Sequence, residues 1–250
     1  MRPAPKPSGL MLVTQRTIVL HTTRYGDAAL ICEVLAEQAG VVSLMVRVSR
    51  SRRAAVSHTL FSPLALLDLT WNNTSSGIPR CRAAQLSVPL PSIARHPYKS
   101  AIALFLSEFL HNAVRLEAAP GPLFGYVQRS VQWLDTSQRG FANFHLVFLL
   151  HVVRFLGFAP NLEGYRPGCW FDMQAGRFVA LRPAHPHVLE PAEAALLPHL
   201  RRMDFATMHV FRFTGAERSR LLERINDYYR LHVPAFPQLR SLAVLHQVFS

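Results

Sequence analysis

The sequence has few cysteines and lacks the short motifs that mark many enzymes. Its three cysteines, Cys32, Cys81 and Cys169, are odd in number and widely spaced. Because no C-x-x-C pair occurs, the sequence predicts neither a disulfide framework nor a four-thiolate zinc site, and a reducing cytoplasm is expected. The motifs G-x-x-x-x-G-K-[ST], G-x-G-x-x-G, H-E-x-x-H and G-x-S-x-G are also absent. Catalysis therefore has no sequence signature here.

Long uninterrupted hydrophobic runs are missing as well. The most apolar run, residues 144–158, is interrupted by His145, His151 and Arg154, so it is too short and too polar to span a membrane. Residues 1–10 contain three prolines and no apolar core of the signal-peptide type. We interpret them as a disordered leader, and we expect no membrane partner.

Positive charge is in excess and is unevenly distributed. The formal net charge is +12, and only two of the 27 basic residues are lysines. Residues 41–100 carry eight basic residues and one acidic residue, whereas residues 101–250 carry fifteen and eleven. A basic excess in one segment predicts a polyanionic partner, although the preference for arginine over lysine runs through the whole chain.

The most basic stretch begins as a strand and continues as a loop. Residues 41–48 are mostly β-branched or apolar and follow a glycine, which is typical of a half-buried strand. Arg47, Arg50, Arg52 and Arg53 then fall within seven residues without an acid. A solvated loop is one interpretation. We favour a phosphate-binding edge, because guanidinium groups bind phosphate oxygens bidentately.

The first 90 residues have the pattern of a small β-barrel. Short runs rich in β-branched and apolar residues alternate with turn residues, without a helix-length pattern between them. The five expected strands are residues 16–21, 28–35, 41–48, 60–71 and 79–88. Five such strands predict a small closed or nearly closed all-β barrel over residues 11–90.

A group of prolines near residues 89–97 marks a boundary, after which the hydrophobic period becomes helical. Residues 98–250 are expected to form an all-α helical-bundle domain. An irregular insert is expected at about 158–189, with a weak hairpin at 171–179. The expected helices are residues 101–116, 122–134, 141–156, 190–202, a helix opened by the Thr214–Glu217 capping box, and 239–249.

Two arginines flank a cysteine on the expected fifth strand. Residues two apart on a strand share a face, so Arg80 and Arg82 point the same way and Cys81 points inward. Two interpretations stay open: the arginines extend the phosphate-binding surface, or they only make the outer face of the barrel soluble. Aromatic residues that are candidates for stacking on bases, or for the core, are Tyr25, Phe61 and Trp71.

Other polar groups are weaker candidates. Cys169, Asp172, His185 and His187 include metal-ligand types but lack regular spacing, so no metal and no other cofactor is expected. The arginines on the helix after Thr214 are interspersed with acids, so we interpret them as a solvated face. These arginines are Arg218, Arg220 and Arg224.

The order of several short segments resembles RecO, the bacterial recombination mediator family, over nearly the whole length. The matching pieces are Ile18-Val19-Leu20 followed by Tyr25-Gly26-Asp27, Gly40 leading to Val46-Arg47-Val48-Ser49-Arg50, Phe61-Ser62-Pro63-Leu64, residues 105–110, residues 155–161 and Leu239-Arg240-Ser241-Leu242. Many members of the family carry a four-cysteine zinc motif where residues 162–173 retain only Cys169, and Lys-Gly where this chain has Arg47-Val48.

The resemblance implies a non-enzymatic protein in which residues 11–90 form an all-β OB-fold DNA-binding barrel, followed by an all-α helical domain. It implies binding to single- and double-stranded DNA, strand annealing, binding to the acidic C-terminal tail of single-stranded-DNA-binding protein, and action with RecR to load RecA. A cytoplasmic, nucleoid-associated location follows. Two alternatives stay open: a metal-dependent nuclease that uses the histidine-rich middle, and an adaptor that binds only proteins. The expected DNA-binding residues are Arg24, Tyr25, Arg47, Arg50, Arg52, Arg53, Arg80 and Arg82, and the peptide-binding residues are Arg139, Arg154, Arg201 and Arg202.

Overall fold

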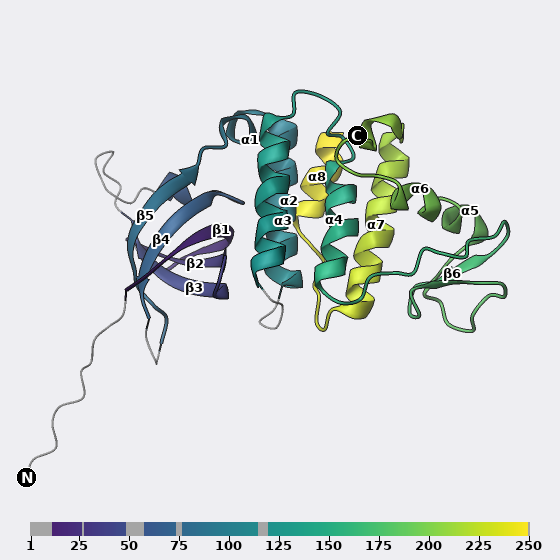
Figure 1. The fold of residues 1–250 in the computed structure, drawn as a ribbon, viewed down its shortest axis with the longest axis horizontal. Coiled ribbons are helices and arrows are strands. Elements are labelled where there is room, and N and C mark those ends of the chain that lie inside the picture. The colour runs from purple at the N-terminus through teal and green to yellow at the C-terminus, as the bar shows by residue number, and fades with distance from the viewer. Residues whose placement is uncertain (1–11, 27, 49–57, 74–76, 115–119, 250) are drawn as a thin grey trace, which may run out of the picture. The chain divides into compact units, whose positions relative to one another are not determined.

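The computed structural model describes residues 12–26, 28–48, 58–73, 77–114 and 120–249. The chain divides into two compact units (Figure 1). The first is residues 1–89 with 119–125, and the second is residues 90–118 with 126–250. Each unit is described by itself.

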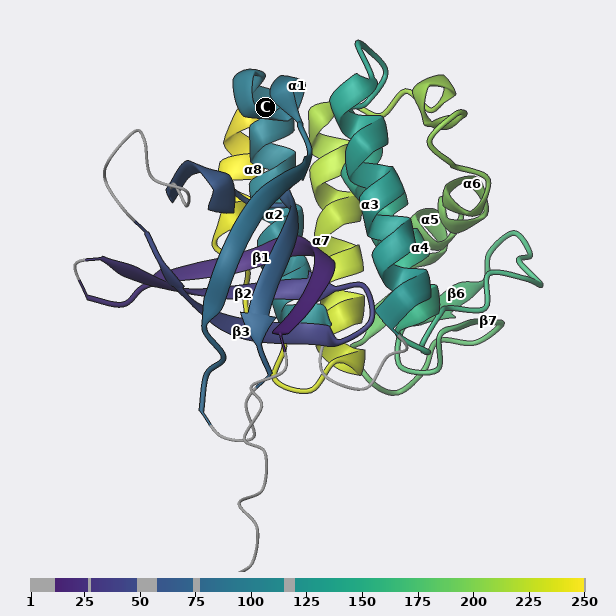
Figure 2. The same cartoon turned by 60° about the vertical axis from the view of Figure 1, so that its left-hand side comes forward.

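The first unit is a five-stranded antiparallel sheet that curls on itself, as its curved strands show in Figure 2. The strand order is β3-β2-β1-β4-β5. The sheet closes where Met45 pairs with Arg80 in parallel and the Met45 N–H donates to the Pro79 carbonyl at 2.8 Å. This confirms the five expected strands and the OB-type barrel. The strands are β1 (Leu12–Arg24), β2 (Ala29–Ala36), β3 (Gly40–Arg47), β4 (Leu66–Asn72) and β5 (Cys81–Val88).

The barrel interior follows the two-residue period of its strands. On β2, Leu30, Cys32 and Val34 are buried and alternate with partly exposed residues. They pack in one hydrophobic cluster with Leu67 and Leu69 of β4. The side chains that alternate with the core residues therefore remain available at the outer face and at the strand ends.

The fourth strand begins later than expected. Residues 58–61 form a 3₁₀ helix (η1, His58–Phe61), and the prediction of one strand over 60–71 was wrong at its start. Pro63 cannot donate to a ladder, and Leu64 adopts a left-handed φ of 59°. The Leu64 N–H donates to the Val19 carbonyl at 3.0 Å, where β1 carries a bulge. The chain therefore turns before β4 starts.

The second unit is mainly helical, and no described helix of the protein combines the length and apolarity that a membrane crossing needs. Pro91 and Pro97, two of the prolines near the expected boundary, each begin a helix, because proline suits the first helical turn. The expected helix over 190–202 is two short helices. The helices are α1 (Pro91–Arg95), α2 (Pro97–Ala113), α3 (Pro120–Thr136), α4 (Phe144–Phe155), α5 (Pro191–Ala194), α6 (Leu197–Arg201), α7 (Gly215–His232) and α8 (Ser241–Phe249), with the 3₁₀ turn η2 (Met208–Val210).

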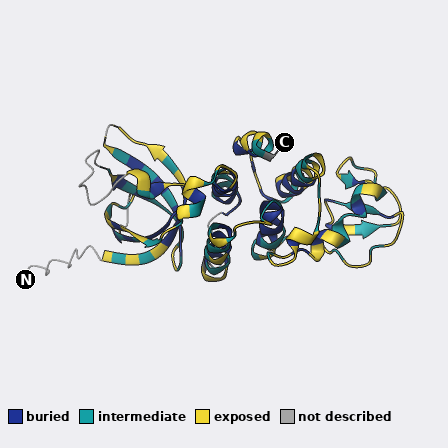
Figure 3. Ribbon diagram, turned by 90° about the horizontal axis from the view of Figure 1, so that it is seen from above, coloured by how far each residue is buried: buried dark blue, intermediate teal, exposed yellow. Residues whose placement is uncertain are grey.

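Aliphatic and aromatic side chains fill the interior of this unit, where Figure 3 shows buried residues along the inner faces of the helices. Phe109 of α2 meets Tyr229 of α7 edge-to-face, with ring centroids 4.7 Å apart. The expected capping box is confirmed at the start of α7. The Thr214 side chain accepts from the Glu217 N–H, and the Glu217 carboxylate accepts from the Thr214 N–H.

The irregular segment contains a small three-stranded sheet. The expected hairpin is confirmed as β6 (Trp170–Asp172) and β7 (Arg177–Val179), and the short strand β8 (Val188–Leu189) pairs with β6 on the other side. Strand β8 was not expected, because two residues are too few to show a period. This sheet supplies one wall of the cavity described below.

Candidate functional site

Arginines gather at one end of the barrel because of strand register. Arg24 ends β1 opposite Leu30, and Arg47 ends β3 opposite Ala29, so the two arginines lie on either side of the start of β2. Both are exposed. Tyr25 follows Arg24 in the turn, with its side chain 56% exposed and its N–H donating to the Ala29 carbonyl at 2.9 Å.

Two further arginines lie where β5 closes the barrel. The parallel pairing of Arg80 with Met45 places Arg80 two residues from Arg47 along β3. Arg80 and Arg82 are both exposed, and the Arg82 Nε donates to the Asn72 carboxamide oxygen at 3.2 Å. The β4–β5 register shifts between Cys81 and Ala83, so the simple alternation that predicted a shared face for the two arginines does not hold there. Cys81 lies between them and packs against the core, as predicted. We name Arg24, Tyr25, Arg47, Arg80 and Arg82 the barrel patch.

No acidic side chain among the described residues neutralises this patch. Within the described residues, none of its four arginines forms an ion pair. By contrast, Arg16 on β1 pairs bidentately with Glu37, and this hydrogen bond raises the pKa of Arg16. The barrel patch is therefore a surface whose positive charge is open to an anion.

Some predicted residues do not join the patch. Phe61 and Trp71 are each only 3% exposed and belong to the core, so of the two interpretations that the sequence left open, the core one is confirmed for both and neither can stack on a base. Arg50, Arg52 and Arg53 lie outside the described residues.

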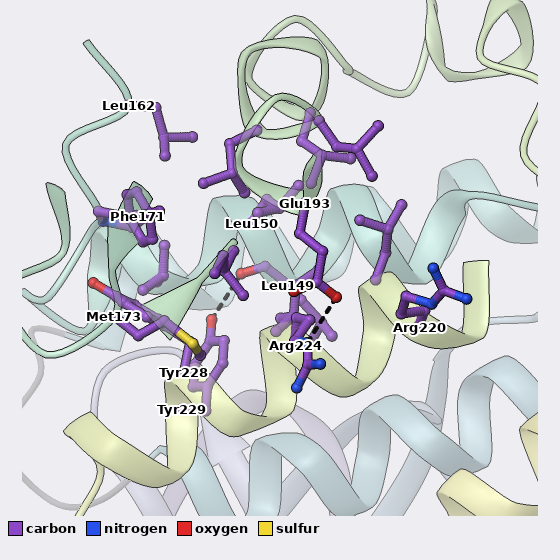
Figure 4. A pocket seen from close by; sticks show the side chains of 18 of the residues that line it. Leu149, Leu150, Leu162, Phe171, Met173, Glu193, Arg220, Arg224, Tyr228 and Tyr229 are labelled. Carbon is purple, nitrogen blue, oxygen red and sulfur yellow. Dashed lines mark hydrogen bonds and ion pairs between the residues drawn. The ribbon is translucent and has the colours of Figure 1, made fainter. Parts of the chain in front are cut away.

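The helical unit contains an apolar pocket of about 180 Å³ (Figure 4). Leu149 and Leu150 of α4 face Leu221 and Tyr228 of α7 across it. The small sheet and the two short helices supply the remaining walls. The other apolar lining residues are Val153, Pro160, Leu162, Phe171, Met173, Leu189, Ala192, Leu196, Leu197, Leu200, Ile225 and Tyr229.

Two tyrosines hold the elements around the pocket together. The Tyr229 hydroxyl donates to the Leu149 carbonyl at 2.7 Å, and the Tyr228 hydroxyl donates to the Phe158 carbonyl at 2.9 Å. Burial raises the pKa of both phenols, so they remain neutral donors. A Cβ at Gly176 would lie 2.8 Å from the Tyr228 hydroxyl, so that position requires glycine.

The pocket rim is charged. Arg220 and Arg224 are four residues apart on α7 and both line the pocket. The Arg224 Nε donates to the Glu193 carboxylate at 3.1 Å, whereas Arg220 forms no ion pair with another described residue. Glu217, also at the rim, is engaged in the capping box. An unpaired guanidinium therefore stands beside an apolar cavity.

Two of the predicted peptide-binding arginines lie next to this pocket. Arg154 and Arg201 line a hollow that shares Leu150, Pro160 and other apolar residues with the pocket. Arg201 is 3.5 Å from the Glu163 carboxylate. Arg139 and Arg202 are exposed and line neither cavity.

Comparison with known proteins gives the family. Residues 11–89 match the model described as "Recombination protein O N terminal", and residues 95–243 match "Recombination protein O C terminal". The chain is 47% identical over 234 residues to the DNA repair protein RecO of Phocaeicola vulgatus, covering 93% of this chain and 97% of that protein. It is 35% identical over 244 residues to RecO of Porphyromonas gingivalis, covering 96% of this chain and all of that protein.

The chain belongs to the RecO family of DNA repair and recombination proteins. This confirms the resemblance seen in the sequence. The two family models also match the two parts of the fold, because the first covers the OB-type barrel and the second covers most of the helical unit.

The side chains that the sequence offered as weak candidates for metal binding lie in the segment around the small sheet of this RecO-family chain. Within the described residues no three His, Cys, Asp or Glu side chains come together as ligands. Cys169 is buried, and His185 lies with its Nε2 3.3 Å from the Asp172 carboxylate. Hydrogen bonds and the neighbouring His185 hold the pKa of Asp172 below its usual value despite burial, which opposes the shift.

Sequence reasoning missed Arg220 and Arg224 as rim residues of this RecO-family pocket. The acids on α7 suggested a solvated face, but Arg218 is half-buried and its Nε donates to the Asn143 carboxamide oxygen at 3.1 Å. One feature of the sequence could have indicated the rim. Each rim arginine is followed directly by an apolar residue, Leu221 or Ile225, that lines the cavity.

Proposed function

We propose that this chain is a non-catalytic recombination mediator. It binds single- and double-stranded DNA, anneals complementary strands, and with RecR helps to load RecA onto DNA coated by single-stranded-DNA-binding protein, on the nucleoid in the cytoplasm. The observation that carries the proposal is the barrel patch, where four arginines stand without an acidic partner in the described chain. Membership of a DNA repair family supports it.

The proposed mechanism at the barrel is neutralisation of phosphates. Arginines at the patch bind phosphate oxygens of the backbone and release condensed counterions. Because complementary strands repel each other through their phosphates, partial neutralisation lowers the barrier to pairing. Tyr25, the exposed aromatic residue of the patch, supplies a surface on which an unpaired base stacks. Such contacts position DNA without selecting its sequence.

The proposed role of the helical unit is to bind an acidic peptide with an apolar final residue. A dry apolar cavity of about 150 Å³ is large enough for benzene, so the pocket of about 180 Å³ accommodates one aromatic ring. Arg220 at the rim pairs with a carboxylate of the peptide, and Arg154 and Arg201 in the adjoining hollow meet others. This is the chemistry of the tail of single-stranded-DNA-binding protein.

A salt titration tests the DNA proposal. Labelled single-stranded and duplex DNA are titrated with the protein at several salt concentrations, and annealing of complementary strands is followed under the same conditions. We expect affinity to fall linearly on a log–log plot. Nicking of DNA with a divalent metal would favour a nuclease instead, and absence of DNA binding would favour an adaptor.

A peptide titration tests the pocket. An acidic fluorescent peptide ending in phenylalanine is titrated without DNA, alongside the same peptide lacking that phenylalanine. We expect tight binding only for the complete peptide, since its ring fills the cavity. Equal binding of the two would exclude a specific apolar pocket. A protein with Arg220→Ala provides the matched test of the rim.

A further inference from the structure

One arginine of the barrel patch, Arg82, lies in a distortion of strand β5. The register of β4 and β5 skips one residue of β5 between Thr70 and Trp71, which makes Arg82 the extra residue of a β-bulge. Beyond the bulge, the Asn72 N–H donates to the Arg80 carbonyl at 3.4 Å. A bulge bends the strand that carries it and gives the side chain of the extra residue a new direction.

The side chain of Asn72, the last residue of β4, holds this redirected arginine. Asn72 is only 7% exposed, and its Oδ1 accepts a hydrogen bond from the Arg82 Nε at 3.2 Å. Because a guanidinium carries donors only, the atom that faces it must be the carboxamide oxygen and not the nitrogen. A buried amide of the barrel wall therefore fixes one edge of the Arg82 guanidinium.

Arg82 differs in this respect from the rest of the barrel patch. Among the described residues, the side chains of Arg24, Arg47 and Arg80 make no hydrogen bond. The side chain of Arg82 makes one, to Asn72, and no other described acceptor meets it. Its two terminal nitrogens therefore remain for a ligand, in an orientation that the barrel sets beforehand.

The carboxamide of Asn72 orients the guanidinium without cancelling its charge. Elsewhere in the barrel, Glu37 holds Arg16 through an ion pair, which neutralises that arginine. A carboxamide oxygen accepts from the same kind of nitrogen and adds no negative charge. Holding a long side chain in place before binding removes part of the entropy that a ligand would otherwise lose in ordering it. Asn72 and Arg82 together therefore form an oriented cation.

We propose that Asn72 is a positioning residue of the barrel patch, which directs the terminal N–H groups of Arg82 at one phosphate of the DNA backbone. With the Nε engaged, one N–H from each terminal nitrogen remains for a bidentate contact with two phosphate oxygens. Arg82 is then the fixed contact of the patch, around which the unheld arginines adjust. This inference rests on the proposed DNA-binding function.

Salt titrations of DNA binding by the whole protein separate the charge of Arg82 from its orientation. Arg82→Ala removes the charge, so affinity should fall and the slope of log affinity against log salt should drop by about 0.7 on single strands and about 0.9 on duplex. Asn72→Ala keeps the charge and frees the side chain, so affinity should fall about two- to tenfold with an unchanged slope. Asn72→Asp keeps the acceptor and cancels the charge, so affinity and slope should both fall.

A double-mutant cycle tests the pair without disturbing Asn72 in the first step. Arg82→Lys keeps the charge but has no Nε–H for the carboxamide, so it should lower affinity and leave the slope unchanged. Combined with Asn72→Ala, it should weaken binding clearly less than the product of the two separate effects, because both changes break the same hydrogen bond. A combined effect equal to that product would overturn the proposal.

Gln15→Ala is the matched control. It also removes a carboxamide oxygen of the barrel, one that accepts from the Gln38 and Ala39 N–H groups outside the patch, and should leave DNA binding unchanged. Parent affinity in Asn72→Ala, with binding weakened in Arg82→Ala, would overturn this inference alone and would mean that Asn72 serves only the fold. Parent affinity and slope in Arg82→Ala would overturn it together with the part of Arg82 in the proposed DNA binding.

Discussion

The barrel and the helical unit present positive charge in different ways. In the barrel, strand register alone brings together Arg24, Arg47 and Arg80, and the described acids do not pair with them. In the helical unit, Arg224 is balanced by Glu193, and an apolar cavity lies beside the rim. The barrel is therefore suited to a long polyanion of any sequence, and the pocket is suited to one peptide end.

The barrel patch and the pocket differ in the interaction that would hold a ligand. Phosphate contacts weaken steeply with salt because they release counterions. Transfer of an aromatic ring into a pocket is driven by apolar burial, which depends far less on salt. We therefore expect the proposed DNA binding by the barrel patch to depend more on salt than the proposed peptide binding by the pocket.

The largest expected effect is the loss of stability that follows when a core leucine of one unit is replaced by alanine. Leu67 is fully buried in the barrel cluster, so Leu67→Ala should destabilise the barrel by about 2–5 kcal/mol. Leu146→Ala, at a fully buried position on α4, is the matched change in the helical unit. Hydrogen exchange should show lost protection in residues 29–47 for the first variant and in residues 144–155 for the second. The same pattern in both variants would contradict two separate cores.

Acid should weaken the helical unit before the barrel. Full burial lowers the pKa of His145 to about 3, with Arg218 and His246 adding to the effect. An unfolded histidine titrates near 6.5, so between these values the unfolded chain binds an extra proton. The stability from this group is thus present above pH 6.5 and falls by about 1.4 kcal/mol per pH unit as pH falls toward 3.

The matched variant for this effect is His145→Gln, which cannot take up the proton. Urea unfolding of the helical unit should depend less on pH in this variant between pH 6.5 and 4.5. In the barrel, the described histidines His21 and His58 are exposed, so hydrogen exchange there should change little over this range. An unchanged pH dependence in the variant would contradict the assignment.

A smaller effect is expected at the start of α7. Thr214→Ala removes the side chain that caps the Glu217 N–H, which should cost about 1 kcal/mol. Because α7 carries Arg220 and Arg224, peptide affinity should also fall modestly, while DNA affinity stays the same. Thermal unfolding and the two titrations check this, and Thr214→Ser should restore both values.

The smallest expected effect is that of a chelator. Since the described residues place no three ligand side chains together, purified protein should contain zinc well below one equivalent. EDTA should leave the melting temperature unchanged. A stoichiometric zinc signal in elemental analysis would contradict this prediction.

The sequence was informative where local rules decide structure. Alternating residues identified the five barrel strands, the prolines near residues 89–97 coincided with a change of unit, and Thr214 with Glu217 located a helix start. The family resemblance was also correct. The start of β4 was misjudged, because the left-handed turn at Leu64 depends on pairing with Val19 in another strand.

The lining residues of the pocket could not be predicted from local sequence patterns. Its walls come from α4, the small sheet, α5, α6 and α7, and the Tyr229–Leu149 hydrogen bond joins residues 80 positions apart. No periodicity in the sequence indicates that Arg220, Leu189 and Phe171 line one cavity. Binding of an acidic tail was expected from the family resemblance, but the residues of the pocket emerge only from tertiary packing.

The most direct test of the central claim compares salt dependence in two variants. Arg47, Arg80 and Arg82 are replaced by Ala in one protein, and Arg220 by Ala in the other. We expect the slope of log DNA affinity against log salt to fall by about 2–3 units in the barrel triple variant and to stay unchanged in Arg220→Ala. Affinity for the acidic peptide should fall in Arg220→Ala and stay unchanged in the barrel triple variant. An unchanged affinity and slope in the triple variant would contradict the assignment of DNA binding to the barrel patch.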